Sequence, residues 1–325
     1  MIKVTVVIPS GGFAATAIAP LEVFYCAGSL WNECVGRTPE PRFTVEAASV
    51  CAGPVDCAYP LTITPEKTIE QVADTDLVFL PTVGNNIDAT LARHAGLMPW
   101  LRRMHDRGSA IAAVCSGVVF PAAAGLLDGH RATTHWALAD VCQDRFPKVQ
   151  WQPERMVTED QGMFCGGGVY AAMDVALYIV QKYCGHDIAV QASRALLVDM
   201  PRTYQSAYAV VPLSAPHHDE KVRQAEELIQ ARYAGDVRIT DIARSLGMTS
   251  RTLMRRFRQA TGRLPGAYVQ AFRISVARDL LETSTDTVQT IGAAVGYSDV
   301  AFFRRLFKRY TGMAPVQYRT QFMQM

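Results

Sequence analysis

The chain has 325 residues, 49% of them hydrophobic, and eight cysteines. Such a length can bury two hydrophobic cores, and the cysteines, without CxxC pairs or regular spacing and mostly within apolar runs, favour a reduced, cytoplasmic protein. The total charge of +2 conceals a basic end, because residues 219–325 carry 17 Lys and Arg against 10 Asp and Glu. Residues 4–21 lack charge, but Pro9 to Gly12 interrupts them too early for a membrane span.

Residues 1–200 alternate short apolar runs with helical segments. The expected strands are Val4–Ile8, Phe43–Ala47, Asp76–Leu80 and Ala110–Val114, and the expected helices include Pro20–Ala27 and Met98–Arg107. Near the end of this region, three glycines at 166–168 lead into an apolar helix that ends at Tyr183. This alternation predicts an α/β fold, a doubly wound parallel sheet of the flavodoxin-like kind with helices on both faces.

Cys115 is the most chemically suggestive residue of this region. It follows an expected strand directly and is followed by Ser116, a glycine and a helix. This order is typical of a nucleophile elbow, a strained turn at which a helix N-terminus lowers the pKa of a thiol. Cysteine catalysis would also need a base and an oxyanion donor, for which His135 and the backbone near Gly84 are candidates. A buried structural cysteine is the alternative interpretation.

The segment from Pro201 to His218 contains three prolines and is predicted to be an irregular linker, with the domain boundary within residues 201–219. The adjacent His217 and His218 have no cysteine or carboxylate at ligand spacing, so we expect neither a metal site nor another cofactor. The chain therefore divides into a domain at 1–200, a linker at 201–219 and a C-terminal domain at 220–325.

The C-terminal domain contains one pattern twice. Residues 242–247 recur at 291–296 with an offset of 49, and the residues after the turn recur with an offset of 50, so one residue is inserted at the turn. Each copy is predicted to form a helix, a tight turn at a glycine and a second helix, because glycine adopts a positive φ at little cost. We expect the N-cap of the second helix at 249–250 and at 298–299.

The second helix of each copy has one apolar face and one basic face. The outward residues are Arg251, Met254, Arg255 and Arg258 in the first copy, and Ala301, Arg304, Arg305 and Lys308 in the second. Arginine suits such a face because its planar group can bond guanine or grip phosphate. A basic helix alone is usually only a solvated surface, but two in register predict that the protein binds double-stranded DNA.

Three motifs in the second copy resemble the most diagnostic segment of the AraC/XylS family of transcription regulators. They are Gly296-Tyr-Ser298, Phe302-Phe-Arg-Arg-Leu-Phe-Lys308 and Tyr310-Thr-Gly-Met-Ala-Pro-Val-Gln-Tyr-Arg319. The resemblance covers about residues 220–323 and implies two helix-turn-helix units joined by a long helix around 264–282. It also implies a recognition helix in each of two successive major-groove turns, and RNA polymerase as a partner.

The same resemblance indicates which side chains face the bases. By position they are Arg251, Met254 and Arg255 in the first unit, and Ala301, Phe302 and Arg305 in the second. Ala301 and Phe302 are apolar where the family reads bases. Contact with thymine methyl groups or a positioning role is therefore expected there instead of hydrogen-bond readout.

Residues 2–185 resemble the ThiJ/PfpI, or class I amidotransferase-like, superfamily. The resemblance rests on the Cys115 turn, on Gly125-Leu-Leu-Asp-Gly129 and on Ala132-Thr-Thr-His-Trp136. Glu22, in Pro20-Leu-Glu-Val-Phe24, matches the segment where that superfamily places an acidic residue beside the cysteine. The fusion of the two domains resembles the GlxA-type subgroup. Peptidases of the superfamily carry histidine directly after the cysteine, whereas this chain has Ser116, so we expect a non-catalytic domain.

These resemblances imply a homodimeric regulator whose N-terminal domain binds a small effector, for which a nitrogen-containing catabolic metabolite is the expected class. The expected effector-binding residues are Glu22, Gly84, Cys115, Ser116, His135 and Trp136. Three alternatives stay open for this domain. It could be a cysteine-dependent amidase, hydratase or peptidase in which Cys115, Glu22 and His135 are catalytic, a redox sensor in which Cys115 oxidises, or a domain kept only for dimerisation.

Overall fold

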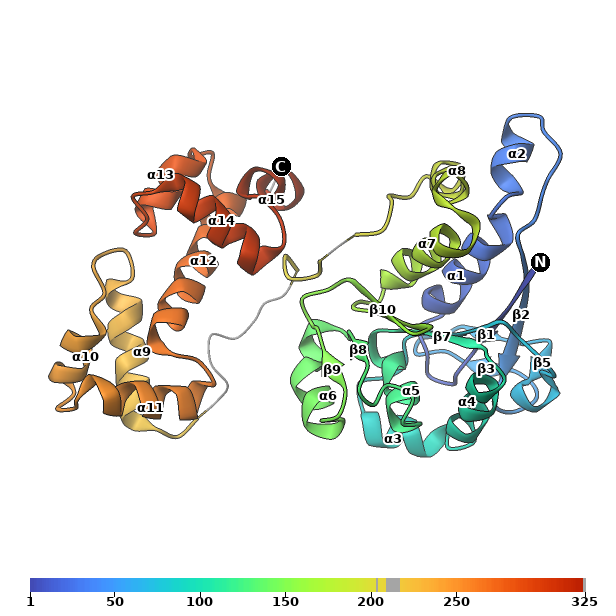
Figure 1. The fold of residues 1–325 in the computed structure, drawn as a ribbon, viewed down its shortest axis with the longest axis horizontal. Coiled ribbons are helices and arrows are strands. Elements are labelled where there is room, and N and C mark those ends of the chain that lie inside the picture. The colour runs from blue at the N-terminus through green and yellow to red at the C-terminus, as the bar shows by residue number, and fades with distance from the viewer. Residues whose placement is uncertain (203, 209–216, 324–325) are drawn as a thin grey trace. The chain divides into compact units, whose positions relative to one another are not determined.

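The computed structural model describes residues 1–202, 204–208 and 217–323, which form two compact units, Met1–Gln205 and Ser206–Met325 (Figure 1). Among the described residues, no helix combines the length and apolarity needed to cross a membrane.

A seven-stranded sheet forms the middle of the first unit. Its order is β10-β11-β7-β6-β1-β2-β5, and every neighbouring pair is parallel except β10 and β11. The strands are β1 Ile2–Val7, β2 Phe43–Ser49, β5 Lys67–Thr68, β6 Leu77–Leu80, β7 Ala110–Val114, β10 Val157–Asp160 and β11 Met163–Gly166. Two small pairs lie outside it, β3 Val55–Asp56 with β4 Thr62–Ile63, and β8 Arg131–Ala132 with β9 Gln150–Trp151. The predicted doubly wound parallel sheet is confirmed.

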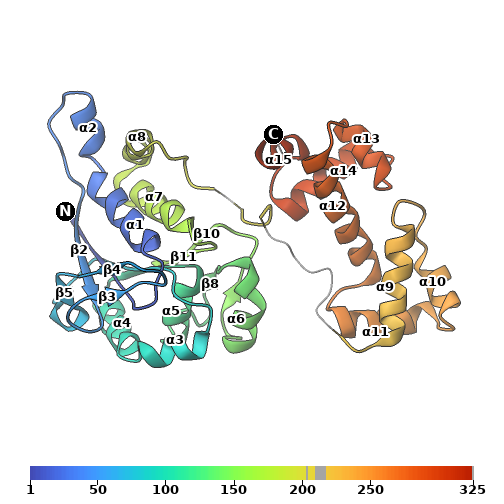
Figure 2. The ribbon, with the colours of Figure 1, turned by 180° about the vertical axis from the view of Figure 1, so that it is seen from behind.

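Helices cover both faces of this sheet (Figures 1 and 2). One face carries α1 Ala15–Cys26, α7 Ala171–Cys184 and α8 His186–Leu196, with α2 Leu30–Cys34 beside them; the other carries α3 Ile87–Arg93, α4 Leu97–Asp106, α5 Val119–Ala123 and α6 Ala139–Arg145. Successive strand residues point to opposite faces, so that Phe79 joins one core and Leu80 the other. Burial on both faces explains why β6 and β7 read as continuous apolar runs.

The first helix begins earlier than expected. The sequence predicts a start at Pro20, but α1 begins at Ala15 and contains Pro20 within it. Proline lacks the amide that would bond the carbonyl of Thr16. The helix nevertheless runs through Pro20, and Thr16 and Ala17 in the turn before it are buried, both at most 2% exposed.

The described ends of the expected linker are packed. Arg202 forms an ion pair with the buried Asp174, with guanidinium nitrogens 2.6 and 3.2 Å from its carboxylate oxygens, and Gln205 is 2% exposed in the first unit. Ala207 is buried in a core of the second unit, and Asp219 is the N-cap of its first helix. Specific partners therefore hold both described ends of this segment, and the division between the two units, after Gln205, falls within it. Residues 209–216 of that segment lie outside the described residues.

The second unit is helical. Its helices are α9 Glu220–Arg232, α10 Ile239–Ser245, α11 Ser250–Thr261, α12 Pro265–Thr283, α13 Val288–Ala294, α14 Val300–Thr311 and α15 Pro315–Phe322. The pairs α10–α11 and α13–α14 are the two predicted helix-turn-helix units, and α12 is the expected long helix between them. The first turn has four residues, 246–249, and the second has five, 295–299. This difference is the inserted residue that the two repeat offsets predict.

Candidate DNA-binding surface and effector site

The first recognition helix, α11, presents an exposed basic face. Thr249 caps it, with its hydroxyl oxygen accepting the amide of Thr252 at 3.2 Å, and the preceding Gly247 has φ +70°. Leu253 and Phe257 are fully buried beneath the helix. The four residues predicted from the sequence, Arg251, Met254, Arg255 and Arg258, are all exposed. This face is therefore available to a ligand as large as DNA.

The second recognition helix, α14, is built in the same way. The Asp299 carboxylate accepts the amides of Ala301 and Phe302 at 2.8 and 2.9 Å, and these bonds hold the pKa of Asp299 below its usual value. The predicted residues Ala301, Phe302, Arg304, Arg305 and Lys308 are exposed. The Phe302 ring lies 5.8 Å from that of Tyr297, centre to centre. Phe302 therefore has a packing partner in the turn, as a positioning role requires.

In the first unit, Cys115 adopts the geometry of a nucleophile elbow. It lies between β7 and a short 3₁₀ helix, η2 Cys115–Val118, and has φ +55°, a value that is strained for a residue with a side chain. The turn packs so closely on the end of β6 that a Cβ atom at Gly117 would lie 2.2 Å from the carbonyl oxygen of Pro81. The Thr134 hydroxyl donates to the Cys115 carbonyl at 2.9 Å. These contacts hold the strained turn in place.

The thiol itself is not activated. Cys115 is only 4% exposed, and burial raises its pKa, against smaller opposing effects of the Ser116 amide and the Thr82 hydroxyl. The expected lowering of the thiol pKa is therefore wrong, because η2 is a single short turn and desolvation outweighs its dipole. Burial also lowers the pKa of His135, whose Nδ1 accepts the amide of Ala137 at 3.1 Å and caps η3 Trp136–Leu138. Both groups are uncharged at neutral pH.

The other predicted effector residues differ in how exposed they are. Ser116 is fully buried, and its hydroxyl exchanges two hydrogen bonds with the backbone of Val83, at 2.6 and 3.0 Å, so it does not face a ligand. Gly84 lies on an exposed loop. Glu22 is exposed on α1, where its charge acts on the pKa of Cys26. The side chain of Glu22, expected beside Cys115, is therefore exposed, whereas Cys115 is buried.

The loop around His135 is held by a residue that the sequence did not indicate. The side-chain nitrogen Nε2 of Gln205 donates to the Thr134 carbonyl at 2.7 Å, and the side-chain oxygen Oε1 accepts the Trp136 backbone amide at 3.2 Å. A Cβ atom at Gly167 would lie 2.2 Å from Gln205 Nε2, so the glycine makes room for this side chain. The His135 and Trp136 rings lie next to each other, with centres 5.2 Å apart. Gln205 is thus the last residue of the first unit and a support of its candidate effector loop.

Residues 13–182 match the DJ-1/PfpI family, and residues 242–321 match a helix-turn-helix domain. The chain belongs to the DJ-1/PfpI family. Its second unit is an AraC-type helix-turn-helix domain. The HTH-type transcriptional regulator GlxA of Rhizobium meliloti is 30% identical over 222 residues, which cover 67% of this chain and 68% of that protein. The regulator ArgR of Pseudomonas aeruginosa is 29% identical over 231 residues, which cover 68% and 67%.

Other similarities cover a smaller part of the chain. Isonitrile hydratase of Pseudomonas putida is 32% identical over 137 residues, but these cover only 42% of this chain and 58% of the hydratase. The structure of Drosophila melanogaster DJ-1beta covers 61% of this chain and 98% of its own, with a TM-score of 0.51 and 21% identity. An AraC family transcriptional regulator from Pseudomonas putida covers 60% and 100%, with a TM-score of 0.52 and 18% identity. These two structures support the fold, and the relatives matched over most of the chain identify it as a transcriptional regulator.

Proposed function

We propose that the chain recognises specific operator DNA through α11 and α14. The observation that carries this proposal is the pair of capped recognition helices, each with its apolar side buried and its cationic side exposed. Arg255 and Arg305 occupy equivalent positions in the two helices and are proposed to read bases, whereas Arg258 and Lys308 are proposed to bind phosphates. The excess of cationic residues after 219 supplies the non-specific attraction to the duplex.

We further propose that the DJ-1/PfpI unit binds a small effector without turning it over. The raised pKa of the buried Cys115 thiol supports this, because nucleophilic catalysis needs a thiolate, and the Nδ1 of His135 already accepts the amide of Ala137. The same raised pKa disfavours a peroxide sensor, since oxidation follows thiolate character and exposure. The effector class, a nitrogen-containing metabolite whose catabolic genes are the targets, rests on the resemblance to GlxA-type regulators.

Gln205 could couple effector binding in the first unit to the DNA-binding unit. It holds the loop of His135 and Trp136, and it lies two residues before Ala207, which is buried in the core of the second unit. A ligand that rearranges this loop would alter the anchoring of the chain just before the second unit. Control of this kind requires the effector to bind the two loop arrangements with different affinities. The proposed regulator acts in the cytoplasm as a homodimer, together with RNA polymerase.

Genomic footprinting of the full chain tests this proposal. We expect discrete promoter sites with the wild-type chain and with Cys115→Ala, and loss of those sites in the Arg255→Ala, Arg305→Ala double variant. Effector screening by thermal shift then follows from the genes beside the sites. Uniform occupancy of DNA without discrete sites would refute the regulator. Turnover of a screened amide or isonitrile that disappears in Cys115→Ala would establish an enzyme instead.

A further inference from the structure

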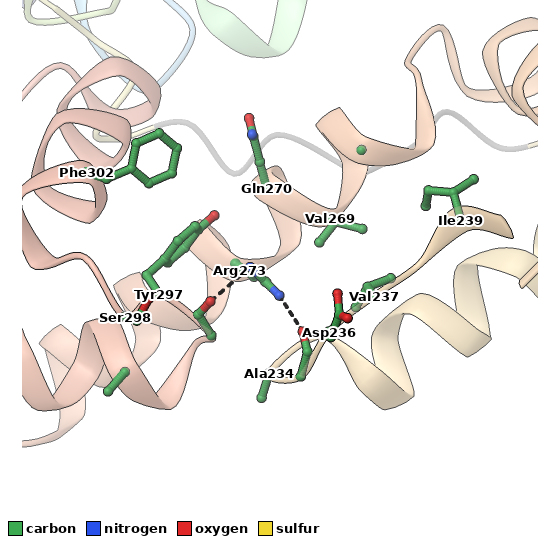
Figure 3. A pocket seen from close by; sticks show the side chains of 14 residues that line it. Ala234, Asp236, Val237, Ile239, Val269, Gln270, Arg273, Tyr297, Ser298 and Phe302 are labelled. Carbon is green, nitrogen blue, oxygen red and sulfur yellow. Dashed lines mark hydrogen bonds between the residues drawn. The ribbon is translucent and has the colours of Figure 1, made fainter. Parts of the chain in front are cut away.

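A cavity of about 810 Å³ lies between the two helix-turn-helix units, and α12 forms its back (Figure 3). Arg273 projects from the middle of α12, and Figure 3 shows its hydrogen bonds running to opposite walls of this cavity. One wall is the loop between α9 and α10, and the other is the turn between α13 and α14. Arg273 therefore lies where the two helix-turn-helix units meet.

The guanidinium of Arg273 joins three backbone segments. Its Nε donates to the Tyr233 carbonyl at 2.7 Å, and one terminal nitrogen donates to the Gly235 carbonyl at 2.7 Å, both just before the first helix-turn-helix unit. The other terminal nitrogen donates to the Gly296 carbonyl in the second turn at 3.1 Å. The guanidinium carbon also lies 5.0 Å from the centre of the Tyr297 ring, a cation–π distance. A planar group with donors on three sides can make this set of contacts, and a lysine ammonium cannot.

The turn between α13 and α14 also approaches the loop between α9 and α10 directly. Gly296 has φ +87°, and a Cβ atom there would lie 2.8 Å from the carbonyl oxygen of Ala234 and 2.9 Å from the Arg273 guanidinium carbon. Only glycine allows this approach together with this backbone conformation. Gly296 thus forms the turn of the second helix-turn-helix unit and also allows its contact with the loop that precedes the first helix-turn-helix unit.

We propose that Arg273 is a positioning residue that fixes the spacing and orientation of the two recognition helices, so that they bind DNA as one rigid body. The inference rests on the proposed operator recognition by α11 and α14. It implies that each chain accepts one separation between its two half-sites. It also implies that an effector acts on the DNA-binding unit as a whole, and not by changing the separation of the two recognition helices within it.

The test uses the full chain and an operator selected from random duplexes by the wild type. Affinity is measured for this operator, for versions with one or two base pairs inserted between the half-sites, and for each half-site alone. We expect the insertions to weaken wild-type binding about tenfold or more, because both half-sites no longer bind at once. Arg273→Ala should bind the selected operator about tenfold more weakly, discriminate little between spacings, and keep the wild-type affinity for single half-sites. Arg273→Lys should resemble Arg273→Ala.

Arg232→Ala is the matched control, because Arg232 is an exposed arginine at the end of α9 and its loss should not alter spacing discrimination. Gly296→Ala should also reduce spacing discrimination, but because Gly296 has φ +87° in the turn of the second helix-turn-helix unit, it should weaken binding of that unit's half-site as well. If Arg273→Ala does not fold, the lysine variant decides in the same assay. Wild-type spacing discrimination in the folded Arg273 variants would overturn the inference while leaving operator recognition intact. Failure of the wild type to select any operator would overturn both.

Discussion

Replacing Gln205 with alanine removes a side chain whose residue is 2% exposed and which supports the candidate effector loop. Its amide group serves the Thr134 carbonyl, the Trp136 amide and the Arg155 carbonyl, at 2.7, 3.2 and 3.1 Å. Each buried polar group that loses a partner costs roughly 1–3 kcal/mol, and the Thr133 hydroxyl already satisfies Arg155 in part. We therefore expect a loss of about 3 kcal/mol in the free energy of unfolding of the first unit. For a unit of this size, that lowers the melting temperature by roughly 6–12 °C.

The assay combines thermal unfolding with amide hydrogen exchange. Gln205→Ala should speed exchange of the Trp136 amide, whose acceptor it removes, more than exchange in the central strand β7, which opens only when the whole unit unfolds. Gln181→Ala is the control, since Gln181 is an exposed glutamine on α7. Gly167→Ala should reproduce the effect of Gln205→Ala by displacing the side chain. An unchanged melting temperature together with unchanged Trp136 exchange would show that Gln205 does not hold this loop.

Three further predictions address other parts of the account. Arg255→Ala should weaken operator binding by about 1–3 kcal/mol through loss of a base contact, whereas Arg232→Ala should not; equal losses in a binding titration would indicate a purely electrostatic role. The hydrogen bond from Arg256 lowers the pKa of Asp219, so this carboxylate stabilises the fold above its ordinary pKa of about 3.9 and loses that contribution as pH falls through the lowered value. Asp219→Asn should therefore flatten the acid-unfolding curve, and superimposable curves would contradict the pairing. Because the pKa of Cys115 is raised, iodoacetamide at neutral pH should modify the exposed Cys34 first, and faster labelling of Cys115 by mass spectrometry would restore the redox hypothesis.

Four strands were predictable from local apolar or β-rich runs. The expected run at 110–114 coincides with the fully buried β7, and the run at 43–47 lies within β2 and is mostly half-buried. The four-residue β11 is buried throughout but was not expected. The shortest strands did not produce apolar runs that could be recognised in the sequence. β5 has two residues, and β10, the antiparallel edge strand, is largely half-buried over its four residues. Their pairing depends on neighbours distant in sequence, which a local apolar pattern does not reveal.

The DNA-binding surface was predictable because it repeats. Periodicity identified the exposed faces of α11 and α14, and the turn glycines and caps marked the start of each helix. The contributions of Arg273 and Gln205 could not be predicted, since each contacts backbone groups more than 20 residues away, and those contacts form only in the folded chain. The raised pKa of Cys115 could not be predicted from the sequence either. A nucleophile-elbow motif specifies a turn, whereas the thiol pKa depends on how deeply that turn is buried.

The most direct test of the central claim is selection of duplexes from a random pool by the full wild-type chain, repeated with Arg255→Ala and with Arg305→Ala. We expect the wild type to enrich a bipartite site whose halves lie roughly 10 base pairs apart, one helical turn, as two recognition helices on one face of the duplex require. Each variant should relax the base preference in one half and leave the other unchanged. No enrichment by the wild type, or the same loss of preference across both halves in each variant, would contradict recognition by two separate reading helices.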